Sequence, residues 1–130
     1  MNGETLLKNN VEVNNNMKNL TISIRTHFTY EQIKGLLDSA SRGSDYWCEN
    51  GLAYESETDK ALTITGVLIK DYETEPNKST SLNLSKIKKG LTVMAKKYPK
   101  HFADFLQEDY DETTGDVFLQ CCIYGEIIYS

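Results

Sequence analysis

Asp111-Glu112-Thr113-Thr114-Gly115-Asp116-Val117-Phe118-Leu119-Gln120 is an acidic, turn-forming segment that opens directly into an apolar one, and Tyr124-Gly125-Glu126 follow it. Thr113 or Thr114 can cap a helix that begins here, because a hydroxyl oxygen accepts hydrogen bonds from N–H groups of the first turn. Gly125 comes directly after the apolar stretch, and glycine commonly ends helices because it adopts positive φ without strain. The segment therefore predicts an apolar helix that ends at about residue 124.

Three further helices are indicated upstream of this segment. Thr29 and Gln32 have the spacing of a capping box, and apolar residues follow it with helical spacing. The strongest helical pattern covers residues 84–98, where apolar residues recur at intervals of three, four and seven, and Pro99 closes it. A short helix then places Phe102 and Phe105 on one side.

The strand pattern is weaker and lies mostly in the middle of the chain. Residues 20–24 alternate as in a half-buried strand, residues 45–48 are rich in aromatic residues, and residues 62–69 form the clearest central strand. Residues 55–60 are predicted as a loop, and residues 127–129 as a last strand. We expect an α+β fold, a small and mainly antiparallel sheet packed against about four helices. Residues 1–17 are predicted to be a flexible leader, and residues 18–130 a single domain.

The composition limits the possible functions. The formal net charge of −5 argues against general DNA binding, which needs a basic surface to release counterions. The cysteines Cys48, Cys121 and Cys122 lack the spacing of a zinc site, and reduced, buried thiols are expected. There is no signal peptide and no apolar run long enough to cross a membrane. We therefore expect a cytoplasmic protein without metal, cofactor or membrane contact.

The order of several short motifs is similar to that of a known group. A helix ending in Ala40-Ser41-Arg42-Gly43 precedes Tyr46-Trp47-Cys48, and the segment 111–126 comes last. Over residues 31–129 this order resembles a widespread group of small phage and prophage accessory proteins, which often carry Gly-Gly-x-x-Tyr-Trp after the first helix. Arg42 stands where the first of those glycines is common. The resemblance implies phage ancestry and the host cytoplasm, and small phage proteins of this size are often counter-defence factors.

Tyr46 and Trp47 are candidate stacking residues for a ligand. On a strand, consecutive side chains point to opposite faces, so one ring is expected in the core and the other at the surface. The sequence does not decide which ring is exposed, and Trp47 is also the kind of large residue that fills a core. Arg42 could pair with a phosphate beside a stacked base, and Arg25 is a second candidate anion contact.

A lysine-rich helix supplies the remaining candidate residues. Six of the fourteen basic residues fall within residues 86–100. Among them, Lys86 and Lys89 are predicted to lie on the outer side of the helix and to contact a ligand. Such a run is commonly only a solvated face. The alternative is a positive wall that helps to hold a nucleotide.

Catalytic and calcium-binding motifs are not indicated. Counted from Asp109, the sixth and twelfth positions of a calcium loop would hold Thr114 and Gln120 instead of glycine and glutamate. His27 and His101 have no serine or cysteine partner arranged as a dyad or triad in the sequence. We therefore expect a protein that is not an enzyme.

These residues lead to two functional hypotheses. The first is a phage counter-defence protein that binds and sequesters a nucleotide-type immune signal, of the cyclic nucleotide or ADP-ribose kind, without cleaving it. A homo-oligomer is expected, because small proteins commonly enclose a charged ligand between subunits. The alternative is an anti-CRISPR-like inhibitor whose acidic loops occupy a surface of a host effector.

Overall fold

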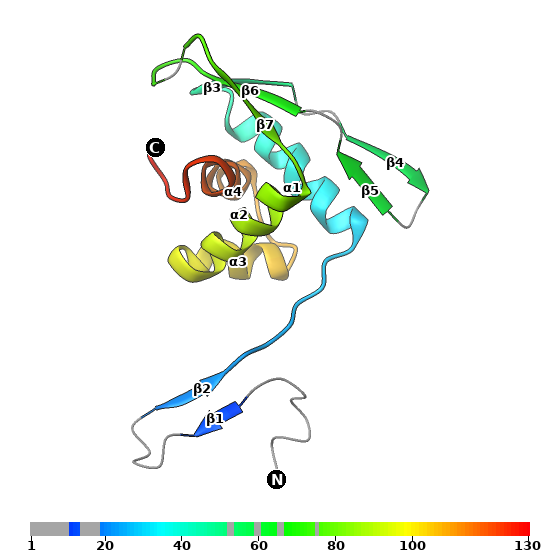
Figure 1. The fold of residues 1–130 in the computed structure, drawn as a ribbon, viewed down its shortest axis with the longest axis vertical. Helices are drawn as coiled ribbons and strands as arrows, with labels where there is room; N and C mark the ends of the chain where they lie inside the picture. Colours follow the sequence, from blue (N-terminus) through cyan, green and yellow to red (C-terminus); the bar gives the residue numbers. More distant parts are fainter. Residues whose placement is uncertain (1–10, 14–18, 52–53, 59–60, 65–66, 75) are drawn as a thin grey trace.

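The computed structural model describes residues 11–13, 19–51, 54–58, 61–64, 67–74 and 76–130, and it has the predicted α+β architecture (Figure 1). The strands are β1 Val11–Val13, β2 Leu20–Ile22, β3 Cys48–Gly51, β4 Tyr54–Thr58, β5 Ala61–Ile64, β6 Val67–Asp71 and β7 Ser79–Leu82. The helices are α1 Tyr30–Gly43, α2 Leu84–Lys97, α3 Pro99–Leu106 and α4 Glu112–Tyr124. A three-stranded antiparallel sheet of order β3-β6-β7 lies beside the helices.

The strand boundaries differ from the prediction in three places. Residues 44–47 form a turn, in which the Trp47 N–H donates to the Ser44 carbonyl at 3.1 Å, so β3 begins only at Cys48. The predicted loop over residues 55–60 instead contains β4, which pairs with β5. The single strand predicted over residues 62–69 is divided between β5 and β6, and residues 65–66 lie outside the described residues. In all three places local propensity was a poor guide, because strand propensity depends on the surroundings that the fold supplies.

Local signals set the ends of α1 and α2. In α1 the Thr29 hydroxyl accepts from the Gln32 N–H, and the Gln32 side chain accepts from the Thr29 N–H, which is the predicted capping box. In α2 the Asn83 side chain accepts from the Lys86 N–H. Pro99, predicted to close α2, is the first residue of α3, where its missing N–H costs no helical hydrogen bond.

The last helix, α4, is buried from Thr114 to Cys122 and packs against both α1 and α2. Its N-cap is Asp111 and not the predicted Thr113 or Thr114, because the Asp111 carboxylate accepts from the N–H groups of both. Gly125 ends the helix with φ 74°, as predicted.

Helix α4 can approach α1 closely because residue 115 is glycine. A β-carbon there would overlap backbone atoms of Ser39 and Ala40 in α1.

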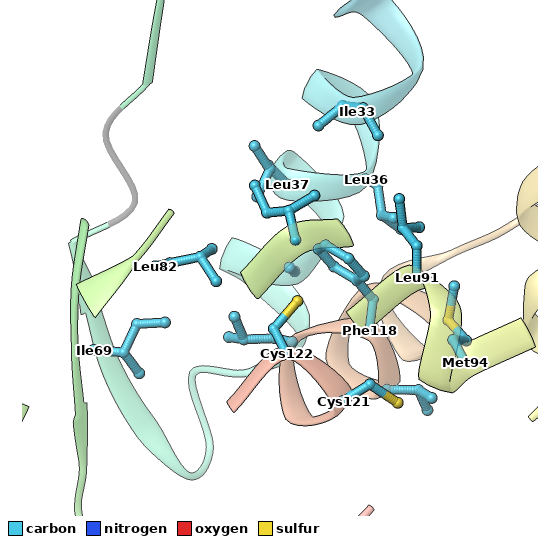
Figure 2. Packing of buried hydrophobic residues seen from close by; sticks show 14 of the residues in the cluster. Ile33, Leu36, Leu37, Ile69, Leu82, Leu91, Met94, Phe118, Cys121 and Cys122 are labelled. Carbon is cyan, nitrogen blue, oxygen red and sulfur yellow. The ribbon is translucent and has the colours of Figure 1, made fainter. Parts of the chain in front are cut away.

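The hydrophobic core lies between these helices and the sheet. Figure 2 shows Ile69 and Leu82 of the sheet pointing toward Cys122 of α4, with Leu37 of α1 close by. All three cysteines are free and buried, as predicted, and burial raises the pKa of the Cys121 thiol to about 11. The core therefore joins the sheet to α4 through side chains that carry no charge.

Residues 126–130 are held by side chains instead of forming the predicted last strand. The Gln120 side-chain oxygen accepts from the backbone N–H groups of Ile128 and Tyr129 at 2.7 and 2.8 Å. The Ile127 N–H donates to the Tyr98 hydroxyl at 2.8 Å. These bonds take the place of a neighbouring strand.

The β1–β2 hairpin stands away from the helices (Figure 1). The predicted strand at residues 20–24 is present as β2, but it is not half-buried: Leu20, Ile22 and Ile24 are 64%, 47% and 62% exposed. β1 lies within the predicted leader and therefore gives structure to part of it, while residues 1–10 and 14–18 lie outside the described residues. An extended segment, residues 23–29, joins the hairpin to α1.

Candidate functional site: an acidic hub, a cleft and a basic groove

The Tyr46-Trp47 pair and the Asp111–Gln120 segment meet at one buried carboxylate. Asp116 accepts from the Tyr46 hydroxyl at 2.6 Å and from the Trp47 indole N–H at 2.7 Å. The Gln120 amide donates to the same carboxylate at 3.0 Å. Burial of the phenol, and then its hydrogen bond to Asp116, raise the pKa of Tyr46 well above its usual range. The two most distinctive motifs of the sequence are therefore parts of one hydrogen-bond network of Tyr46, Trp47, Asp116 and Gln120, which we call the acidic hub.

Trp47 is a core residue and is not available to a ligand. Only 1% of it is exposed, and its indole stacks on the Tyr129 ring at a centroid distance of 5.0 Å and an angle of 17°. The prediction that Trp47 contacts a ligand is therefore wrong, and Trp47 fills the core instead. Tyr46 is the exposed ring of the pair, at 50%. The physical reason is that both residues lie in a turn, where donation to Asp116 fixes their directions.

A second buried carboxylate fastens residues 126–130 from the other side. Asp71 accepts from the hydroxyl groups of Tyr124 and Tyr129 and from Thr74. Burial alone would raise the pKa of Asp71, but the hydrogen bonds from Thr74, Tyr124 and Tyr129 outweigh it and hold that pKa well below its usual range. Asp71 is thus stabilised as an anion by neutral donors.

Arg42 and Tyr46 line a cleft of about 530 Å³, together with His101, Glu112 and Asp116 among others. Arg42 is paired with Glu112, the guanidinium Nε lying 3.7 Å from a carboxylate oxygen. The lining carboxylates offset the charge of Arg42, so the cleft has little attraction for an anion. The structure brings these two predicted residues together, but in surroundings that the sequence did not indicate.

Arg25 lies in a different and larger depression, which we call the basic groove. It has a volume of about 910 Å³ and lies between the extended segment 24–28 and one side of α2. Its lining residues are Ile24, Arg25, Thr26, His27, Phe28, Leu84, Ile87, Lys88, Leu91, Thr92, Ala95, Lys96 and Phe102. None of these described lining residues is aspartate or glutamate, and the charged ones are all basic.

The wall formed by segment 24–28 is anchored at Phe28. The Phe28 ring stacks on Phe105 at a centroid distance of 5.2 Å and meets Phe102 edge-on at 6.2 Å. Arg25 itself is exposed, as are Lys88 and Lys96 on the opposite wall. None of these three cations forms an ion pair with another described residue.

The lysines that the sequence singled out do not line the groove. The Lys86 ammonium donates to the Ser81 carbonyl at 2.7 Å and so caps the end of β7. Lys89 is exposed and lines neither the groove nor the cleft. Because neighbouring residues on a helix are about 100° apart, the groove side of α2 selects Lys88 and Lys96 instead.

The sequence held a signal for these two lysines. Lys88, Thr92 and Lys96 are spaced by four and accompany the apolar stripe Leu84, Leu91 and Ala95, so they lie on the same side of α2. Nothing in the sequence indicated that segment 24–28 would form the opposite wall.

A metal-binding centre is not formed within the described residues. None of their His, Cys, Asp and Glu side chains form a group of three placed to hold a metal. His101 Nδ1 lies 3.2 Å from the hydroxyl of Thr114, which is buried in α4, and both residues line a small depression of about 260 Å³. Across the same described ranges, the helices are all too short or too polar to span a membrane.

Comparison with known proteins gives no match: no family model, no curated protein and no solved structure is similar to this chain.

Proposed function

We propose that the protein binds and sequesters a nucleotide-type anion in the basic groove without cleaving it, as a phage counter-defence protein in the host cytoplasm. One observation carries the proposal: a groove of about 910 Å³ in which Arg25, Lys88 and Lys96 are exposed, unpaired with any described residue and unopposed by any described lining carboxylate. The volume falls within the range of small-molecule sites, about 300–1,000 Å³.

The chemistry of the groove suits a ligand that is both anionic and partly apolar. Each charge-assisted hydrogen bond from Arg25 or a lysine to a phosphate contributes about 1.5–3 kcal/mol. The floor between the cations contains Leu91, Ala95 and Phe102, against which the flat faces of a base can lie. Sequestration requires only binding, so it needs no catalytic group.

A homo-oligomer is part of the proposal. The hairpin exposes Leu20 and Ile22, and the extended segment that follows it exposes Ile24 at the groove. Two-stranded hairpins are only marginally stable in water by themselves. A second subunit on this side would cover these side chains and would close the groove over its ligand. Native mass spectrometry of protein from cells with an active signalling defence would report both the assembly and any retained ligand.

The binding test is calorimetry against cyclic dinucleotides, larger cyclic oligonucleotides and cyclic ADP-ribose isomers. Arg25→Gln and Lys88→Gln should each weaken binding about tenfold or more, because each removes a charge-assisted contact. Lys89→Gln and Arg42→Gln are matched controls, because they remove the same charge outside the groove and should change affinity less than about threefold.

Two outcomes would overturn the proposal. If Arg42→Gln weakens ligand binding and Lys88→Gln does not, the ligand binds in the cleft and not in the basic groove. If no compound binds below the millimolar range while the protein still blocks an immune effector in cells, the protein–protein inhibitor is the better explanation.

A further inference from the structure

We infer that the ligand of the basic groove carries at least two negative groups separated by a nucleoside, as in a cyclic or linear oligonucleotide, and not adjacent phosphates as in ADP-ribose. This inference rests on the proposed function and specifies the ligand class. It follows from where the cations stand along α2.

Lys88 and Lys96 define the length of the binding site. They are eight residues apart on one helix, so their α-carbons are separated by about 12 Å along its axis. Both line the groove, and Thr92 lies between them. The Thr92 hydroxyl donates to the Lys88 carbonyl at 2.9 Å, so it can only accept a further hydrogen bond and does not supply a cationic contact at the midpoint.

The middle of this wall is apolar. Leu91 is buried to 8% exposure, and Ala95 is half-buried, and both line the groove between the two lysines. For both lysines to contact one phosphate, both side chains would have to extend along the helix over this apolar surface. That arrangement brings two ammonium groups together, and like charges repel each other. Two separate phosphates can contact the same two lysines without that repulsion.

Arg25 on the facing wall is compatible with this arrangement. Its guanidinium can form two parallel hydrogen bonds to a phosphate, which a lysine cannot do. The groove thus presents cations on two walls around an apolar middle, which matches phosphates placed on either side of a base.

The test compares three probes: cyclic di-AMP, whose phosphates are separated by nucleosides, ADP-ribose, whose phosphates are adjacent, and AMP. Lys88→Gln and Lys96→Gln should each weaken the binding of cyclic di-AMP about tenfold. In the double variant the two losses of binding free energy should add. The affinity for ADP-ribose and for AMP should fall about tenfold in only one of the two lysine variants. Lys89→Gln is the control, and circular dichroism confirms that each variant is folded.

The possible failures are distinguishable. If both lysines affect ADP-ribose and AMP as strongly as cyclic di-AMP, the cations form one anion centre, and the spacing inference fails while sequestration stands. If cyclic di-AMP responds to only one lysine, the inference fails in the same way. If none of the probes nor the wider nucleotide panel binds, the inference and the proposed function fall together.

Discussion

The acidic hub around Asp116 and the basic groove beside α2 differ in how their polar groups are satisfied. At the hub, Asp116 receives hydrogen bonds from Tyr46, Trp47 and Gln120. In the groove, Lys88 and Lys96 are exposed and have no ionic partner among the described residues. The first region uses its polar groups to fix the fold, and the second leaves them available.

This difference shows that a distinctive motif need not be a binding site. Within the described residues, no buried side-chain nitrogen or oxygen lacks a hydrogen-bond partner. Burying an unpaired carboxylate is costly, so residues such as Asp116 need specific donors, and this requirement makes the sequence distinctive. Cations on a solvated helix face carry no such requirement and look ordinary in a sequence.

The largest effect is expected at the hub, from Trp47→Ala. The substitution removes a buried indole that stacks on Tyr129 and one of the donors to Asp116. We expect a loss of about 3–5 kcal/mol in the free energy of unfolding, measured by urea denaturation. Tyr46→Phe keeps the ring and removes a half-exposed hydroxyl, so it should cost only about 1 kcal/mol. Equal, small losses in both variants would mean that the hub does not hold the fold.

The second effect tests the close contact between α1 and α4. Gly115→Ala places a methyl group against the Ser39 and Ala40 backbone. Alanine favours a helix by about 1 kcal/mol over glycine, but overpacking against the backbone should outweigh this gain and give a net loss of about 1–3 kcal/mol. The measurement is thermal or urea unfolding. A more stable variant would show that the two helices can separate freely.

Gly125→Asn is the matched control for that substitution. Nothing lies within 4 Å of a β-carbon at this position, and asparagine tolerates the positive φ that Gly125 adopts. Its cost should stay below about 1 kcal/mol.

The third effect is a pH dependence at Asp71. Its pKa in the folded state lies below the usual value, so the folded protein binds fewer protons than the unfolded chain in acid. The stabilisation is therefore present above about pH 4 and is lost as the pH falls below it. Asp71→Asn should lower stability at neutral pH and flatten the decline between about pH 5 and 2. Urea melts across this range should distinguish it from Asp45→Asn, which changes an exposed carboxylate; identical profiles would contradict the assignment.

The smallest effect on stability is expected in the groove. Lys88→Gln and Arg25→Gln remove exposed charges without a described ionic partner, so each should change the unfolding free energy by less than about 0.5 kcal/mol. Unlike Trp47→Ala, substitution of a residue that only binds a ligand should leave the stability of the fold unchanged. A loss above about 1 kcal/mol would show that the side chain has a structural partner.

Local features of the sequence predicted most of the helical structure. The Thr29–Gln32 capping box, the apolar spacing in α2 and the glycine after α4 all act over a few residues, so their consequences can be read directly. The strands were predicted less well. Whether residues 54–58 pair or form a loop depends on the partner strand, and propensity alone did not indicate it.

The α+β class, the four helices and the burial of the cysteines could be predicted from the sequence, because hydrophobic periodicity and capping are properties of neighbouring residues. The role of Trp47 became clear only in the folded protein, since its partner Asp116 is 69 positions away. The groove likewise exists only because segment 24–28 passes beside α2. A side chain is a core residue or a surface contact according to what the fold places against it, and residues distant in the chain supply that environment.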